Sequence, residues 1–277
     1  MLSALLIVFR EVIEAGLIVG IVLAATRGVP RRGLWVSAGV VGGVLGACLV
    51  AAFAGELGAL FQGSGQELFN ATILLLAVVM LTWHNVWMAS HGREMARELR
   101  SVGAQVLSGS RTLTALAVVV GVAVLREGSE VVLFLYGIAA QGGTSNAAML
   151  AGGSLGLVAG AGVSALMFFG LLTIPAHRLF AVTSGLITLL AAGMATQAVL
   201  FIQNGGWLNA LTAPVWDTSW LLREDSIPGR LLHTLVGYSE APDGAQLIAY
   251  GATVLVIVLL MRMVGRGRQG LPAPRPA

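Results

Sequence analysis

The chain has 277 residues, of which 57% are hydrophobic and 10% are charged, and its mean hydropathy is +0.87. This composition excludes an ordinary soluble domain, and the recurring apolar runs of about twenty residues predict an all-α integral membrane protein. Sixteen arginines and thirteen acidic residues give a net charge of +3 without a basic patch, so no nucleic-acid partner is expected. The single cysteine, Cys48, excludes a disulfide framework and a thiolate metal cluster, and we expect it to be buried in its helix.

Seven membrane-spanning helices are predicted within one domain, residues 1–264, which is followed by a basic cytoplasmic tail, residues 265–277. The expected spans are residues 2–26, 34–54, 68–90, 113–140, 147–174, 179–202 and 245–264. Between the third and fourth spans, residues 91–111 are too polar to cross a membrane, and their apolar positions recur at helical spacing. This pattern predicts a separate helix on the membrane surface. Residues 203–244 form a long polar loop.

The distribution of arginines predicts the orientation, because cytoplasmic loops accumulate basic residues. With seven spans, one side collects twelve arginines, and the other side has two, Arg223 and Arg230. The first set is Arg27, Arg31, Arg32, Arg93, Arg97, Arg100, Arg111, Arg178, Arg262, Arg266, Arg268 and Arg275. We therefore expect the N-terminus outside the cell, the C-terminus in the cytoplasm and the 203–244 loop outside.

A charged motif interrupts two of the spans. It reads Arg10-Glu11-Val12-Ile13-Glu14 in the first span and Arg126-Glu127-Gly128-Ser129-Glu130 in the fourth. Ionised side chains in hydrocarbon cost several kcal/mol, so they are expected to face the bundle interior and to serve a function. Within each motif the two glutamates are three residues apart, which places them on nearly the same helix face.

The two motifs are predicted to meet near the middle of the membrane. An odd number of spans separates the first from the fourth, so the two helices run in opposite directions. Residues 1–90 and 113–202 then form inverted three-helix repeats, and the seventh helix stands outside them. Secondary transporters with such repeats bind their ions near the midplane, where the repeats meet and rock to alternate access.

Together the motifs supply four carboxylates and two guanidiniums, with a formal charge of about −2. A multivalent cation would neutralise this charge, and an all-oxygen ligand set selects hard ions such as Mg²⁺, Ca²⁺, Mn²⁺ or ferric iron. The predicted ligands are Glu11, Glu14, Glu127 and Glu130, with Arg10 and Arg126 holding them ionised and oriented. The alternative is structural: each arginine simply neutralises its neighbours, as Arg10 would neutralise Glu14 at i,i+4.

Five further residues are candidates for the ion pathway. His84 and Asn85 of the third span could add ligands, and Gln197 occupies the corresponding place in the sixth span. Hydrogen bonding between neighbouring helices explains such residues equally well. Glu56 and Glu67 could form an outer vestibule that concentrates cations, although acids in short loops are more often only solvated.

The Arg-Glu-x-x-Glu motif in the first and fourth of seven spans resembles that of the oxidase-dependent, high-affinity iron permease family. This family includes fungal ferric permeases and bacterial ferrous or ferric iron uptake permeases. Weaker features in the same order extend the resemblance over most of the chain. They are Trp87-Met88, His91 to Glu94, the Gln197 segment, Trp216 to Ser219, Gly229 to His233 and Gly237-Tyr238.

The resemblance implies a multi-pass protein of the cytoplasmic membrane that takes up iron, with the motif glutamates carrying the metal. It also implies a separate ferroxidase or periplasmic iron-binding protein as the partner that supplies the iron. Some relatives are proposed to move lead, and the ligands also suit manganese, so other metals remain alternatives. No cofactor and no enzymatic activity are expected.

Two other function classes were considered. A proton-coupled carrier of a small organic cation would use the glutamates to bind protons and an amine. A di-metal carboxylate enzyme would usually add Glu-x-x-His motifs from two helices. No glutamate in this chain is followed by histidine three residues later, so the sequence argues against such an enzyme.

Overall fold

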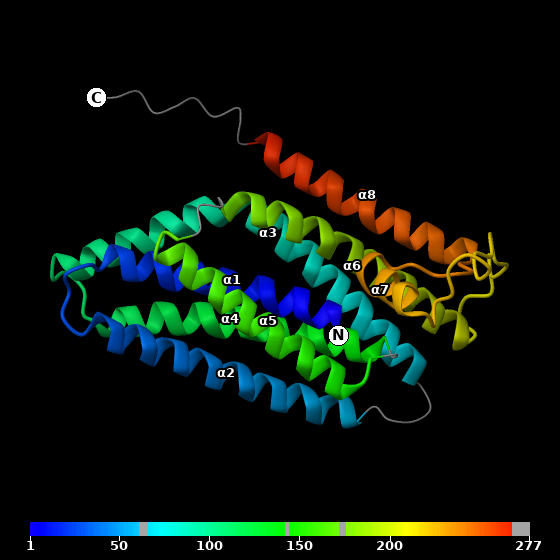
Figure 1. Cartoon of the computed structure of the whole chain (residues 1–277), viewed down its shortest axis with the longest axis horizontal. Coiled ribbons are helices and arrows are strands. Elements are labelled where there is room, and N and C mark those ends of the chain that lie inside the picture. The colour runs from blue at the N-terminus through cyan, green and yellow to red at the C-terminus, as the bar shows by residue number, and fades with distance from the viewer. Residues whose placement is uncertain (61–65, 142–143, 172–175, 268–277) are drawn as a thin grey trace.

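The computed structural model describes residues 1–60, 66–141, 144–171 and 176–267, which form eight α-helices and no β-strand (Figure 1). The helices are α1 (Leu2–Ala25), α2 (Arg32–Leu60), α3 (Gln66–Leu107), α4 (Thr114–Ala140), α5 (Asn146–Phe168), α6 (Ala176–Asn204), α7 (Ile227–Val236) and α8 (Gly244–Gly267). The all-α class predicted from the sequence is therefore confirmed. Most of the predicted basic tail, residues 268–277, lies outside the described residues.

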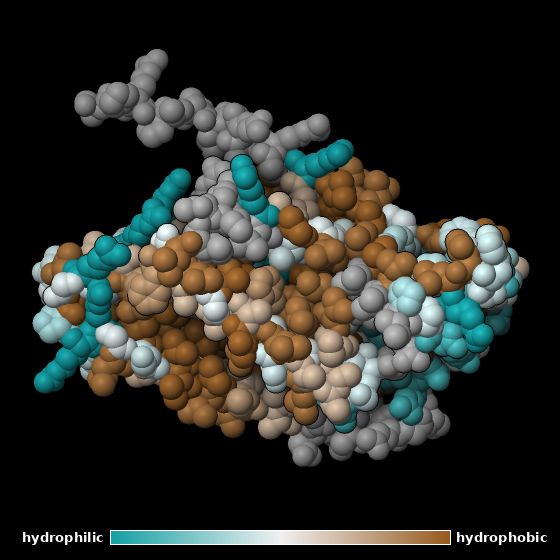
Figure 2. All heavy atoms as spheres, in the orientation of Figure 1, coloured by the Kyte–Doolittle hydropathy of each residue, from teal (hydrophilic) through white to brown (hydrophobic). Residues whose placement is uncertain are grey.

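Five helices are long and apolar enough to cross a membrane: α2, α3, α5, α6 and α8. Figure 2 shows hydrophobic residues over the middle of the molecule and hydrophilic residues gathered toward the two ends of its long axis. Helices α1 and α4 carry the charged motifs, and at 24 and 27 residues they are about 36 and 40 Å long. The described residues therefore form a multi-pass membrane protein, and the seven-span count and its orientation stay predictions.

The predicted break between the third span and a separate surface helix is wrong, because α3 is one continuous helix of 42 residues. Its length of about 63 Å is twice the hydrocarbon thickness of a bilayer. Residues 91–107 are helical, as expected. The fall in hydropathy at residue 91 indicates that the surroundings of the helix change from lipid to water, but it does not indicate where the helix ends. The end of α3 still packs on the end of α1, since a Cβ at Gly103 would collide with Ala25.

The long polar loop contains a helix that the sequence did not predict. Ser226 caps α7 by accepting a hydrogen bond from the Gly229 amide at 3.1 Å, and Gly237 ends the helix with a φ of 73°. This left-handed conformation suits glycine. Gly237 also packs directly on Gly193 of α6, where a Cβ would lie 2.8 Å from the Gly237 Cα. The loop is therefore fixed against the helix bundle.

Glycines allow two close helix contacts, α2 against α4 and α5 against α1. In each contact, the second helix of one predicted repeat packs on the first helix of the other. On α2, a Cβ at Gly39 or Gly43 would lie 2.6–2.7 Å from a carbonyl oxygen of α4. On α5, a Cβ at Gly156 or Gly160 would lie 2.5–2.8 Å from a carbonyl oxygen of α1. Small residues spaced four apart allow such close backbone contact. The contacts of α1 with α5 are thus repeated by those of α4 with α2.

Helices α1 and α4 run in opposite directions, as predicted for the two motif helices (Figure 1). Two buried apolar clusters lie along them. One contains Ile7 of α1 and Phe134 of α4, and the other contains Ile18 of α1 and Val124 of α4. The charged motifs lie between these clusters along both helices, so apolar packing on either side fixes their position.

The expectation that Cys48 is buried is wrong, because it is exposed on α2. Its neighbour Ala47 is buried instead and faces Gly128 of α4. An apolar run in a membrane helix does not distinguish the face that meets protein from the face that meets lipid.

We predict that Gly43→Ala destabilises the protein and that Gly42→Ala on the same helix does not. The new methyl group at residue 43 would lie 2.7 Å from the Gly121 oxygen, whereas nothing lies within 4 Å of a Cβ at residue 42. Overpacking of this kind costs about 1–3 kcal/mol. Thermal unfolding in detergent should show a lower midpoint for Gly43→Ala alone. Equal midpoints would contradict the close approach of α2 and α4.

Candidate functional site

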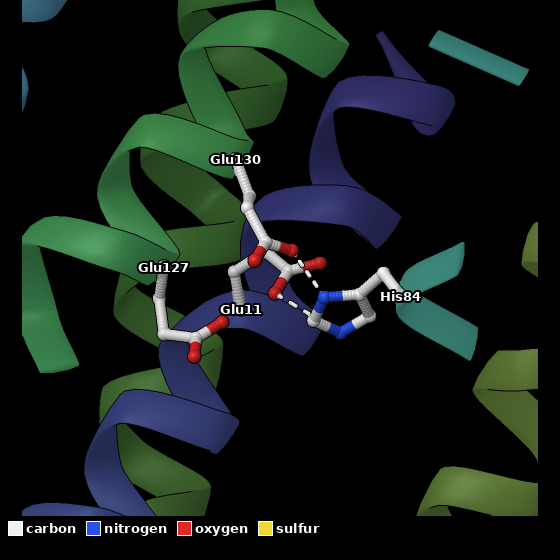
Figure 3. A group of neighbouring side chains, drawn as sticks. All are labelled: Glu11, His84, Glu127 and Glu130. Carbon is white, nitrogen blue, oxygen red and sulfur yellow. Dashed lines mark ion pairs between the residues drawn. The ribbon is translucent and has the colours of Figure 1, made fainter. Parts of the chain in front are cut away.

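The two charged motifs meet in the middle of the helix bundle. Figure 3 shows Glu11 from α1, Glu127 and Glu130 from α4 and His84 from α3 pointing toward one another. One ligand atom of each of these four residues lies within 4.8 Å of the others. Glu11, His84 and Glu127 are buried, and Glu130 is partly buried. A cluster of potential metal ligands thus forms from three helices.

Arg10 is fully buried and binds the glutamates of its own motif. Its Nε lies 2.9 Å from an oxygen of Glu14, four residues later on α1, and a terminal nitrogen lies 3.7 Å from Glu11. Both arginine and glutamate side chains are about 1–2% exposed. Water therefore does not screen this pair, and the arginine charge compensates for the loss of carboxylate solvation.

Arg126 forms the equivalent pair in α4 but in different surroundings. Its Nε lies 3.1 Å from Glu130, and its guanidinium lies 4.3 Å from the ring centre of Trp87 on α3. The Arg126 side chain is 37% exposed. The i,i+4 pairing that the structural alternative describes is thus present in both motifs, and the pair of the first copy is the more deeply buried.

His84 lies between the two motifs. Its Nε2 is 3.3 Å from Glu14 and 3.9 Å from Glu11, and its Nδ1 forms an ion pair with Glu130. The sequence left open whether His84 faces the glutamates or merely bonds a neighbouring helix. The structure places it among the glutamates and connects α3 to both motif helices.

The cluster of potential ligands therefore includes one nitrogen donor, His84, which the sequence offered as a possible addition to the four glutamates. Three carboxylates and one imidazole are within reach of a single ion, and Glu14 lies beside them. Imidazole suits iron, zinc, copper and nickel better than Mg²⁺ or Ca²⁺. In the described part of the chain, Glu127 Oε2 has no hydrogen-bond partner although the residue is only 3% exposed. Such an atom is free to bind a cation.

Gln197 does not join this cluster. Its side-chain nitrogen lies 3.5 Å from Nε2 of His233 on α7, and both residues line a separate cavity of about 80 Å³ with Glu224. Glu224 lies 3.0 Å from Nδ1 of His233, and this ion pair raises the pKa of His233 and lowers that of Glu224. The correspondence of His84 with Gln197 in the sequence is not reproduced in space.

The remaining three candidates are Asn85, Glu56 and Glu67, and none of them is among the four clustered residues. Asn85 is 1% exposed, and neither of its amide atoms has a hydrogen-bond partner among the described residues. Glu56 lies within α2 and not in a loop, but its side chain is outside the described part. Glu67 lies in the first turn of α3, about 25 Å along the helix from His84.

The sequence did not predict the surroundings of Arg126. Trp87 lies under its guanidinium and also stacks on His91, with ring centres 5.2 Å apart. The spacing from His84 through Trp87 to His91 is three and four residues, which places all three on one face of α3. This spacing was visible in the sequence, but the predicted helix break at residue 90 concealed it.

Comparisons with known proteins give one consistent result. Residues 1–267 match the model of the Iron permease FTR1 family. A protein of Escherichia coli O6:H1 named Ferrous iron permease EfeU is 31% identical over 275 residues, which cover 98% of each chain. Proteins with the same name are 30% identical in Shigella sonnei (98% of each chain) and 31% identical in Yersinia pestis (96% of this chain and 94% of the relative). No solved structure matches.

We predict that Arg10→Gln is much more destabilising than Arg126→Gln. Removal of Arg10 leaves the buried Glu11 and Glu14 carboxylates without the guanidinium that neutralises them. The loss of one partner of a buried ion pair costs about 3–5 kcal/mol. The Arg126 side chain is 37% exposed and lines a groove, so its loss leaves a less deeply buried carboxylate and should cost less. Thermal midpoints of the detergent-purified variants should differ accordingly, and equal losses would contradict the different burial of the two arginines.

We predict that the His233–Glu224 pair stabilises the α7 region only at mildly acidic pH. The pair is complete above the ordinary Glu224 pKa of 4.5 and below the ordinary His233 pKa of 6.5. Its contribution is lost as pH rises through the raised pKa of His233, and also as pH falls through the lowered pKa of Glu224.

The measurement is the thermal midpoint of Glu224→Gln and wild type between pH 5 and pH 9. Their difference should be largest near pH 6 and should shrink toward pH 9. The control is Asp225→Asn, because Asp225 is exposed and pairs with the exposed Arg223. A difference that does not change with pH would contradict the ion pair.

Proposed function

Since the chain belongs to the Iron permease FTR1 family, we propose that it carries ferrous iron into the cell and binds the ion at the cluster of motif glutamates and His84. The ligands in this proposal are Glu11, Glu14, Glu127 and Glu130 with the His84 imidazole. The transported ion is the substrate, and no resident cofactor takes part. The family is a transporter family and not an enzyme family.

One observation carries the proposal: the ligand atoms of three buried or half-buried carboxylates and one imidazole lie within 4.8 Å of one another, with Glu14 beside them. A structural role for the arginines alone would need no histidine and no carboxylate with an unpaired oxygen. The four glutamates and two arginines have a formal charge of about −2, which a divalent ion neutralises. The site therefore replaces the hydration shell that the ion loses in the membrane.

The ligand set favours the ferrous state. Ferric iron is a harder ion than ferrous iron and prefers oxygen ligands more strongly, whereas an imidazole nitrogen is a usual ligand of divalent transition metals. The relatives in Escherichia coli, Shigella sonnei and Yersinia pestis bear the name Ferrous iron permease. His84 bridges Glu14 and Glu130 and so lies within reach of a cation held by either motif. The nitrogen that binds the ion must be deprotonated.

The membrane arrangement in this proposal has seven spans, α1 to α6 and α8, with α7 in the extracytoplasmic loop. The arginine-rich turns after α1 and α3 face the cytoplasm. The two Arg-Glu-x-x-Glu motifs then lie near the midplane of the cytoplasmic membrane, in inverted repeats. A separate ferroxidase or periplasmic iron-binding protein delivers the metal at the α7 end.

A second candidate is transport of another divalent metal such as manganese or lead. The same donors bind Mn²⁺, because carboxylates and one imidazole do not reject it. Competition in the transport assay separates these substrates. An excess of Mn²⁺ or Pb²⁺ that abolishes iron uptake would identify a broader metal permease, and an excess without effect would identify an iron-selective one.

The deciding experiment is uptake of radioactive ferrous iron by proteoliposomes that contain the purified protein. We predict that Glu14→Gln and Glu130→Gln each reduce the rate by about a hundredfold or more, because each removes a ligand charge. His84→Ala should raise the iron concentration needed for half-maximal uptake by about 10–100-fold.

The matched control is Ser129→Ala, which alters the second motif without touching the ligands, since the Ser129 hydroxyl donates to the Leu125 carbonyl at 2.7 Å. It should transport at the wild-type rate. Normal uptake by correctly inserted Glu14→Gln or Glu130→Gln would overturn the proposed site.

A further inference from the structure

A groove of about 450 Å³ leads away from the central cluster between α1, α3 and α4. Glu127 and Arg126 line the groove where it meets the cluster, and His91, Glu94 and Glu98 of α3 line it further along. The remaining walls are mostly apolar. The groove extends toward the end of α3 and the start of α4, which is the arginine-rich end of the molecule.

The polar groups of the groove continue the face of α3 that carries His84. The residues His84, Trp87, His91, Glu94 and Glu98 alternate in spacing between three and four, so they form one stripe along the helix. From His84 to Glu98 the stripe covers about 21 Å. A cation that leaves the cluster along this face meets an imidazole and then two carboxylates.

Glu127 belongs to both the cluster and the groove. It is 3% exposed, it is one of the four clustered ligands, and it lines the groove. Its Oε2 has no hydrogen-bond partner within the described residues. A buried carboxylate oxygen without a hydrogen-bond partner costs folding free energy unless a cation or a water molecule binds it. This oxygen is therefore placed to contact a cation that passes between the cluster and the groove.

The Arg126 side chain lies between the groove and the cluster. It pairs with Glu130 on the cluster side and covers Trp87 on the groove side, and its side chain is 37% exposed. Arg10, its counterpart in the first motif, is 1% exposed. The first motif lines a larger cavity of about 1100 Å³ with Arg10 and Glu14, and Glu127 lines it as well. Of these two spaces in the described part of the chain, the groove beside Arg126 is the one whose lining includes His91, Glu94 and Glu98.

We propose that this groove is the route by which the metal leaves the central site toward the arginine-rich end, and that the row of His91, Glu94 and Glu98 lines its path, with Glu94 and Glu98, one helical turn apart, binding it weakly on the way. The inference rests on the proposed function. Carboxylates and imidazole suit a divalent transition metal. Glu94 and Glu98 are exposed, so the ion keeps much of its water there and is released readily. The two carboxylates also offset the repulsion of the surrounding arginines.

The test uses the full-length double variant Glu94→Gln/Glu98→Gln, in which exposed carboxylates become isosteric amides. Mn²⁺ serves as a redox-stable probe, and its binding to purified protein is followed by electron paramagnetic resonance. Wild type should bind one ion tightly and a second one weakly, and the double variant should lose only the weak one. Its maximal rate of iron uptake should fall about tenfold, and Asp225→Asn should leave the rate unchanged.

A labelling experiment reports the groove without relying on transport. In a Cys48→Ser background, Ala123→Cys places a thiol in the groove. Val158→Cys places one halfway along the membrane span α5, on a face that meets lipid in the proposed arrangement and is closed to a water-soluble reagent. A membrane-impermeant maleimide should label only the first thiol, and Mn²⁺ should slow this labelling severalfold. Labelling that Mn²⁺ does not change would overturn the groove site.

The two proposals fail differently. Normal uptake by Glu14→Gln overturns the central site. A second result overturns the groove proposal alone. In that case Glu14→Gln loses uptake, while Glu94→Gln/Glu98→Gln keeps the wild-type rate and binds Mn²⁺ as the wild type does.

Discussion

The structure depends on the neutralisation of four carboxylates inside a bundle that is otherwise apolar. Arg10 compensates the first motif, Arg126 the second, and His84 connects the two. Charges in a medium of low dielectric are tolerated only when opposite charges contact them. The three helices that carry these groups, α1, α3 and α4, must therefore approach closely. Glycines of α5 and α2 then place the backbones of these two helices directly against α1 and α4.

Two copies of one motif have become chemically different because of what surrounds them. The first copy lies between apolar clusters, and its arginine is held by two glutamates. The arginine of the second copy lies on an aromatic ring at the edge of a groove. A partly exposed guanidinium can exchange partners at lower cost than a fully buried one. The sequence repeat therefore does not predict how deeply each copy is buried.

The sequence predicted those features that follow from local periodicity. Glu11 and Glu14 share a helix face because they are three residues apart, and the odd number of spans predicted antiparallel motif helices. Tertiary packing decided the rest. His84 and Gln197 occupy similar places in the sequence, but the turn at Gly237 packs on α6 and brings His233 to Gln197. The helical continuity of α3 was missed, because polarity changes at residue 91 while the backbone does not.

The glycine contacts have a mechanical consequence. Each first helix is joined to the second helix of the opposite half, α1 to α5 and α4 to α2, at distances that leave no room for a side chain. The two halves of the chain are thus interlocked in this conformation. A movement of either half as a block would have to separate both of these glycine contacts, so α1 is expected to move together with α5, and α4 together with α2.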